Sequence, residues 1–92
     1  MREKQIEQRF KREVERRGGL ALKFTPPGWV GAPDRIVLMP GGRVAFVELK
    51  APGGRVRPLQ RKRIDELRAM GFYVAVIHSV DGINEFIEEW LS

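Results

Sequence analysis

Residues 31–50, GAPDRIVLMPGGRVAFVELK, constrain the fold more than any other part of the chain. Two apolar runs flank the segment PGG at 40–42, which predicts two antiparallel strands joined by a tight turn. Asp34 begins the first run, and Glu48 and Lys50 close the second. Asp34 lies about as far before the turn as Glu48 lies after it, so the hairpin predicts that these three charged residues meet at one end of the sheet.

The remainder of the sequence predicts a single α/β domain over residues 1–92, with a mixed sheet flanked by helices. Apolar residues at helical spacing, glycine stops and apolar runs of strand length give the order helix, three strands, helix, strand, helix. We expect a helix over 2–17, strands over 20–25, 34–39 and 43–49, a helix over 58–70, a strand buried on both faces over 72–79, and a C-terminal helix over 81–92. The apolar face of the helix over 58–70 is expected to contain Leu59, Ile64, Leu67 and Met70.

Composition narrows the possible functions. The chain has no cysteine, which excludes disulfides, thiolate zinc sites and cysteine nucleophiles. Its 17 Lys and Arg against 12 Asp and Glu give a net charge of +5, which favours a polyanionic partner such as nucleic acid. Because there is no signal-like or membrane-spanning apolar run, we expect a soluble, cytoplasmic protein.

The three clustered charges predict a metal site. Two carboxylates a few Å apart repel unless positive charge lies between them, and Mg²⁺ prefers oxygen ligands. Asp34 and Glu48 would bind the ion, with the backbone carbonyl of Leu49 as a third oxygen ligand. Lys50 would orient or deprotonate a water and stabilise charge on a phosphate. The alternative is a cross-strand ion network with little energetic value.

The motif in which Pro33-Asp34 is followed by Glu48-Leu49-Lys50 resembles the PD-(D/E)XK nuclease motif. The flanking sequences, GAPDRIVL and VAFVELKAPGGRVRPLQRKRIDELRAMGFYVAVI, resemble the VRR-Nuc family, the virus-type replication-repair nuclease domain. The resemblance runs from the first helix to about residue 88. It implies a restriction-endonuclease-like core of αβββαβ order with a C-terminal helix, and it implies nuclease activity.

The resemblance also implies roles for individual residues. Asp34 and Glu48 would be the metal-binding carboxylates, and Lys50 the catalytic lysine. Gln60, on the second helix, would contact a phosphate or a water beside the site, although an exposed helical residue is the alternative. Glu7 would be the first-helix glutamate that lies near the metal and takes part in catalysis.

Other assignments on the same basis are less specific. Glu3 competes with Glu7, and both could instead be solvated acids at a helix N-terminus. Arg35, which follows the aspartate in the family pattern, would bind phosphate or brace the site. Trp29, in the loop before the motif, would wedge into or stack on unpaired bases, or would pack on the core or on a second subunit. Basic residues that lie next to Lys50 in sequence would follow the DNA backbone or form a solvated basic face: Arg55, Arg57, Arg61, Lys62 and Arg63.

The leading hypothesis is a Mg²⁺- or Mn²⁺-dependent, structure-selective DNA endonuclease. A resemblance to archaeal-type junction resolvases suggests Holliday (four-way) junctions cut by a homodimer, whereas larger family members act on flaps. A phage or prophage origin would suit a standalone domain. A non-catalytic DNA-binding subunit and a basic scaffold are the rival hypotheses. The intact set of Asp34, Glu48 and Lys50 argues against the first, and the second leaves the charged strand ends unexplained.

Overall fold

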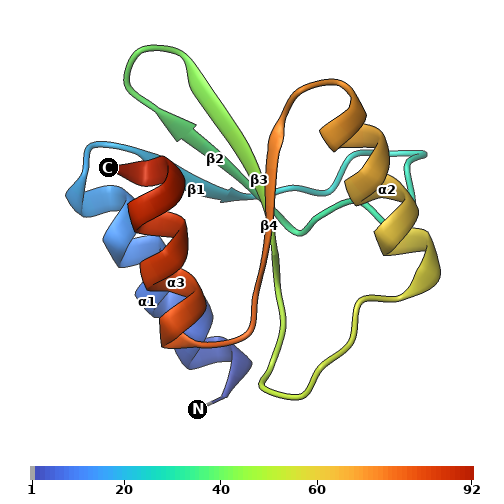
Figure 1. Ribbon diagram of the computed structural model, residues 1–92, viewed down its shortest axis with the longest axis horizontal. Helices are drawn as coiled ribbons and strands as arrows, with labels where there is room; N and C mark the ends of the chain where they lie inside the picture. Colours follow the sequence, from blue (N-terminus) through green and yellow to red (C-terminus); the bar gives the residue numbers. More distant parts are fainter. Residues whose placement is uncertain (1) are drawn as a thin grey trace.

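The computed structural model describes residues 2–92, which form one sheet of four strands and three helices (Figure 1). No helix among these residues has the length and apolar character needed to cross a membrane. The elements, in chain order, are α1 (Glu3–Arg16), β1 (Leu20–Lys23), β2 (Arg35–Met39), β3 (Arg43–Leu49), α2 (Pro58–Ala69), β4 (Tyr73–Ile77) and α3 (Val80–Phe86), followed by a π-helical turn (Ile87–Leu91).

The sheet has the strand order β1-β2-β3-β4. The first two neighbouring pairs are antiparallel, and β4 pairs with β3 in parallel after the crossover through α2. In the hairpin, Arg35 pairs with Val47 and Met39 with Arg43. Extending this register by one residue places Asp34 opposite Glu48, as the sequence predicted.

Helices cover both faces of the sheet, α1 and α3 on one face and α2 on the other (Figure 1). Strand side chains alternate between the faces, so every second residue belongs to the same core. The core under α1 and α3 contains Val37, Ala45, Val47, Leu49 and Ile77, and the core under α2 contains Phe46 and Val74. This alternation decides which face each polar residue at the strand ends can reach.

The predicted elements are confirmed, with shifts of one or two residues at most of their ends. The helix α2 differs from its prediction, because only Ile64 and Leu67 are buried, whereas Leu59 and Met70 are 39% and 65% exposed. The strand β4 is covered on both faces as predicted, but it lies at the edge of the sheet with β3 as its neighbour. The C-terminal helix widens into a π-helical turn at Ile87–Leu91.

The helix α1 is attached to the sheet by three buried residues at i, i+4 spacing, Ile6, Phe10 and Val14. Phe10 also packs against Phe86 of α3, with ring centroids 5.5 Å apart. The two helices therefore share one core, and this core fixes the position of Glu7, one residue after Ile6.

We expect Phe10→Ala to lower the free energy of unfolding by roughly 3–5 kcal/mol, because it leaves a cavity between α1, α3 and the sheet. Urea denaturation monitored by circular dichroism measures the effect. Lys11→Ala, at the next and exposed position of the same helix, is the control and should change stability by less than about 0.5 kcal/mol. Equal stabilities of the two variants would contradict this account of the core.

Candidate active site

Asp34 and Glu48 are held together by a reciprocal pair of hydrogen bonds. The Asp34 backbone N–H donates to Glu48 Oε1 over 3.2 Å, and the Leu49 backbone N–H donates to Asp34 Oδ1, also over 3.2 Å. Each carboxylate thus accepts a bond from the backbone of the other strand. The end of the β2–β3 hairpin is built around this arrangement, which confirms that Asp34 and Glu48 lie together.

Glu48 is almost completely buried, with 3% of its surface exposed, and two side chains stabilise its charge. Lys50 Nζ lies 2.9 Å from Glu48 Oε2, and Gln60 Nε2 donates to the same oxygen over 3.1 Å. Gln60 Oε1 also accepts from the Arg57 backbone N–H over 2.9 Å and so caps the N-terminus of α2. Gln60 therefore connects the start of α2 to Glu48.

The pKa of Asp34 is raised from 3.8 to about 6. Burial of the carboxyl group is the largest cause, and the negative charge of Glu48 is the second. The Leu49 N–H and the Arg35 guanidinium act in the opposite direction, but more weakly. A nearby cation would stabilise the charged form of such a carboxylate.

The donor set fits a hard divalent cation. Two carboxylates converge, and the pKa of Asp34 is raised first by burial and second by the charge of Glu48. The N–H and C=O of a strand residue point to the same side, so the Leu49 carbonyl faces the side of the strand on which its N–H meets Asp34. Residues 2–92 contain no group of three or more carboxylate or histidine side chains placed to hold a metal, so protein ligation would rest on two carboxylates and this carbonyl.

Glu7 and Arg35 form an ion pair on the face of the sheet covered by α1. Glu48 lies on the opposite face, with Phe46, which explains why Glu7 does not complete a cluster with the other two carboxylates. Arg35 is 7% exposed, so its position favours the bracing role over direct contact with DNA. The assignments of Glu7 as a metal ligand and of Arg35 as a DNA contact stay predictions.

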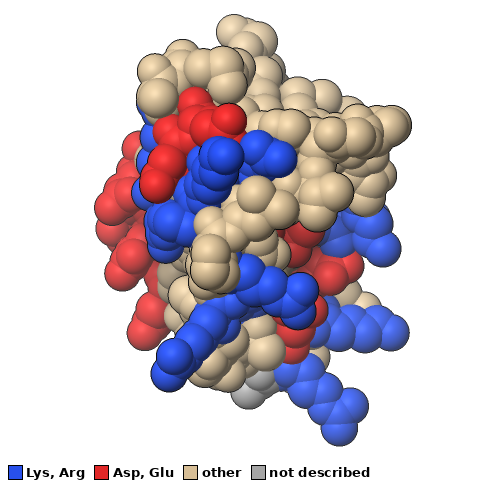
Figure 2. Space-filling view, turned by 90° about the vertical axis from the view of Figure 1, so that its right-hand side faces the viewer, with Lys and Arg blue, Asp and Glu red and all other residues tan. Residues whose placement is uncertain are grey.

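Exposed basic residues extend from Lys50 along the following loop and the start of α2. Figure 2 shows Lys and Arg side chains spread over the middle and lower parts of one face of the molecule. Among the predicted DNA-binding residues, Arg35 is buried and Arg63 is partly buried, whereas the others are exposed: Arg55, Arg57, Arg61 and Lys62. Their role in DNA binding stays a prediction, and their exposure and position beside Lys50 are compatible with it.

The loop before Asp34 is fixed on α2. Arg63 donates to the Val30 carbonyl over 2.8 Å, and its guanidinium lies 5.0 Å from the centre of the Trp29 ring. Gly31 has a φ of +88°, and a Cβ there would come within 2.8 Å of Leu59 Cγ. Trp29 is thus half-buried against α2, and Leu59 supports this loop rather than the core.

The sequence did not predict that two further residues, Lys23 and Thr25, would lie beside Asp34. A hollow of about 260 Å³ is lined by Glu7, Lys23, Thr25, Asp34 and Arg35. Lys23 pairs with Arg35 in the β1–β2 register, and this pairing brings it to the site. No signal within LALKFT alone could identify it, because the register of β1 depends on tertiary contacts.

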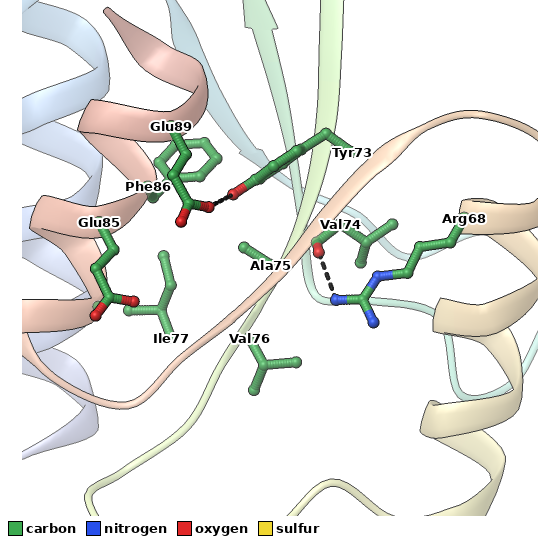
Figure 3. Close-up of a pocket in the computed structure, with 10 residues that line it drawn as sticks. Arg68, Tyr73, Val74, Ala75, Val76, Ile77, Glu85, Phe86 and Glu89 are labelled. Carbon is green, nitrogen blue, oxygen red and sulfur yellow. Dashed lines mark hydrogen bonds between the residues drawn. The ribbon is translucent and has the colours of Figure 1, made fainter.

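A second hollow, of about 190 Å³, runs along the outer edge of β4, away from these carboxylates (Figure 3). Arg68 of α2 lies on one side of the strand and donates to the Val74 carbonyl over 2.7 Å. Glu89 lies on the other side and accepts from the Tyr73 hydroxyl over 2.8 Å. Arg68 thus occupies one carbonyl of the strand edge, which makes the edge a poorer template for strand addition.

Charge is divided unequally along the chain. All 17 Lys and Arg residues lie before residue 69, whereas the segment 69–92 contains only acidic residues among its Asp, Glu, Lys and Arg positions. These acids lie on α3 and the turn that follows it: Asp81, Glu85, Glu88 and Glu89. The C-terminal helix is therefore acidic, and all the Lys and Arg residues lie in the part of the chain that contains the candidate site.

Comparison with known proteins decides the family. The family model for the VRR-NUC domain matches residues 2–81, most of the chain. This chain belongs to the VRR-NUC family. A similar protein, named "Putative nuclease p44", comes from Acyrthosiphon pisum secondary endosymbiont phage 1 and is 44% identical over 81 residues, which cover 88% of this chain and 87% of that protein.

The fold is that of a solved VRR-NUC domain, which matches with a TM-score of 0.88 and 31% sequence identity over 96% of both chains. This match confirms the restriction-endonuclease-like α/β arrangement expected from the resemblance. Together, the VRR-NUC family and the phage relative support a nuclease whose substrate is DNA.

The raised pKa of Asp34 predicts how stability depends on pH without metal. The folded state binds this proton more tightly than the unfolded state, so the free energy of unfolding falls as pH rises from about 4 to about 6. Asp34→Asn keeps an oxygen that accepts the Leu49 N–H but carries no charge.

In EDTA, the Tm of Asp34→Asn should therefore exceed that of the unmodified chain at pH 7.5, and the difference should shrink toward pH 4. Thermal denaturation of both proteins between pH 4 and 8 measures this difference, in which titrating groups remote from Asp34 cancel. A difference that stays constant with pH would show that Asp34 has an ordinary pKa.

Proposed function

We propose that this VRR-NUC protein is a metal-dependent, structure-selective DNA endonuclease that cuts four-way junctions as a homodimer. The observation that carries the metal-dependent chemistry is the pairing of Asp34 with the buried Glu48, with Lys50 Nζ 2.9 Å from Glu48. Such a cluster supplies two carboxylates that can bind a cation and a lysine ammonium group that can contact a phosphate.

Asp34, Glu48 and the Leu49 carbonyl would hold a Mg²⁺ or Mn²⁺ ion. When bound, the ion lowers the pKa of water and offsets negative charge on the phosphate. Lys50, 16% exposed at its side chain, lies where it can donate to a phosphate oxygen while it neutralises Glu48. Gln60 holds Glu48 in position, and the exposed arginines on the adjoining loop and α2 would bind flanking phosphates.

Dimerisation is proposed because each chain carries one such carboxylate pair, whereas resolution of a junction needs two symmetrical cuts. A two-fold axis would place two equal sites on two strands. The two aromatic side chains of the C-terminal helix, Phe86 and Trp90, contact other residues of the same chain and are therefore weak candidates for a dimer surface. Phe86 is 2% exposed, and Trp90 stacks on Phe86 and lies beneath the Arg43 guanidinium.

The carboxylates provide the first test of the chemistry. Asp34→Ala and Glu48→Gln should each lower cleavage of labelled branched DNA in Mg²⁺ by roughly 1,000-fold or more, with DNA binding largely retained. Glu85→Gln, an exposed acid on α3, is the matched control and should cut as the unmodified chain does. Cleavage by Asp34→Ala or Glu48→Gln at the control rate would show that the metal site is wrongly assigned.

The substrate is tested by offering a four-way junction, a flap and a linear duplex in parallel, in Mg²⁺ or Mn²⁺ and in EDTA. We expect paired, symmetrical cuts in the junction, loss of cleavage in EDTA, and a dimer by analytical ultracentrifugation. Cuts confined to the flap would support metal-dependent cleavage but would show that the substrate is a flap and not a four-way junction. Tight junction binding without any cleavage would favour a non-catalytic DNA-binding subunit.

A further inference from the structure

The hollow beside Asp34 extends to the face of the sheet opposite Lys50. Asp34 directly precedes β2, two residues before Ile36, so both lie on the side of Phe46 and Glu48, the face covered by α2. Arg35 lies on the other side, with the core covered by α1. The hollow therefore begins at Asp34 and continues around the end of the sheet to the α1 face.

Lys23 and Thr25 are placed in this hollow by the end of β1. Lys23 lies directly opposite Arg35, so the two side chains share the α1 face. The Phe24 N–H donates to the Asp34 carbonyl over 2.9 Å and continues the pairing beyond the strand. Thr25, two residues after Lys23, consequently lines the same hollow.

The charges in this hollow leave Lys23 available for a ligand. Glu7 and Arg35 are paired with each other, so their charges largely cancel. Within residues 2–92, the side chains of Lys23 and Thr25 form no ion pair or hydrogen bond, and both residues are exposed. An exposed ammonium group and a hydroxyl group at the mouth of a hollow suit a phosphate oxygen.

We propose that Lys23 and Thr25 form a binding subsite for a backbone phosphate that neighbours the phosphate held at Asp34 and Glu48. This inference rests on the proposed nuclease function. Lys50 lies on one side of the carboxylates and Lys23 on the other, so the bound strand crosses the end of the sheet from the α2 face to the α1 face. Lys23 touches no reacting group and acts in binding.

The first experiment compares DNA binding in EDTA over a series of salt concentrations, by fluorescence anisotropy with a labelled four-way junction. Lys23→Gln should weaken binding about tenfold and reduce the slope of log K against log[salt] by about 0.7–0.9, the value for one lost phosphate contact. Arg9→Gln, the matched control, removes one charge from an exposed position about 200° around α1 from Glu7. It should leave the slope unchanged.

A second experiment locates the contact. A set of junctions, each with one neutral methylphosphonate in place of one phosphate, is bound to the unmodified chain, to Lys23→Gln and to Thr25→Val. One position should weaken binding by the unmodified chain and have no further effect on Lys23→Gln. A uniform effect of every position on the unmodified chain and on the two variants, or equal salt slopes for Lys23→Gln and Arg9→Gln, would overturn the subsite.

Neither experiment depends on cleavage, so the failure of the subsite and the failure of the nuclease proposal are distinguishable. Absence of cleavage with a clear Lys23 effect would remove the nuclease proposal and leave a phosphate site. If cleavage occurs, Lys23→Gln should raise the protein concentration needed for half-maximal cutting, with the single-turnover rate at saturation within about threefold of the unmodified chain. A large fall in that saturated rate would instead give Lys23 a direct part in the reaction.

Discussion

The end of the sheet that carries the candidate site is organised around two carboxylates that the hairpin forces together. Asp34 and Glu48 are adjacent because the β2–β3 register makes them adjacent, and each accepts a hydrogen bond from the backbone of the other strand. Lys50 and Gln60 then stabilise Glu48, whereas Asp34 keeps a raised pKa. The fold thus supplies a lysine and an amide partner for Glu48, and in the proposed function a divalent cation would offset the charge of Asp34.

Different contacts support this pair of carboxylates on the two faces of the sheet. On the α2 face, Gln60 joins the helix cap to Glu48, so the position of α2 and the position of the carboxylate are set by one side chain. On the α1 face, the pair formed by Glu7 and Arg35 ties the helix to the strand that begins just after Asp34. The site is therefore supported from both sides although the chain has only 92 residues.

The sequence was sufficient for those features that follow from local pattern. Counting from the turn at 40–42 gave the meeting of Asp34 with Glu48, and apolar spacing gave the order of helices and strands. The contacts of Lys23 and Arg35 could not be predicted from the sequence, because they depend on the register of β1 and on the face that α1 covers. The exposure of Leu59 was likewise hidden, since it depends on the close approach of Gly31 to α2.

The separation of charge along the chain also affects how the protein meets its substrate. With every Lys and Arg before residue 69 and an acidic C-terminal helix, the molecule has an electric dipole as well as a net charge of +5. The field of a polyanion exerts a torque on such a dipole in addition to an attraction. Near DNA the molecule turns its acidic helix away, so more encounters start in an orientation from which the basic part can bind. This gain is greatest at low ionic strength, where the field extends farthest.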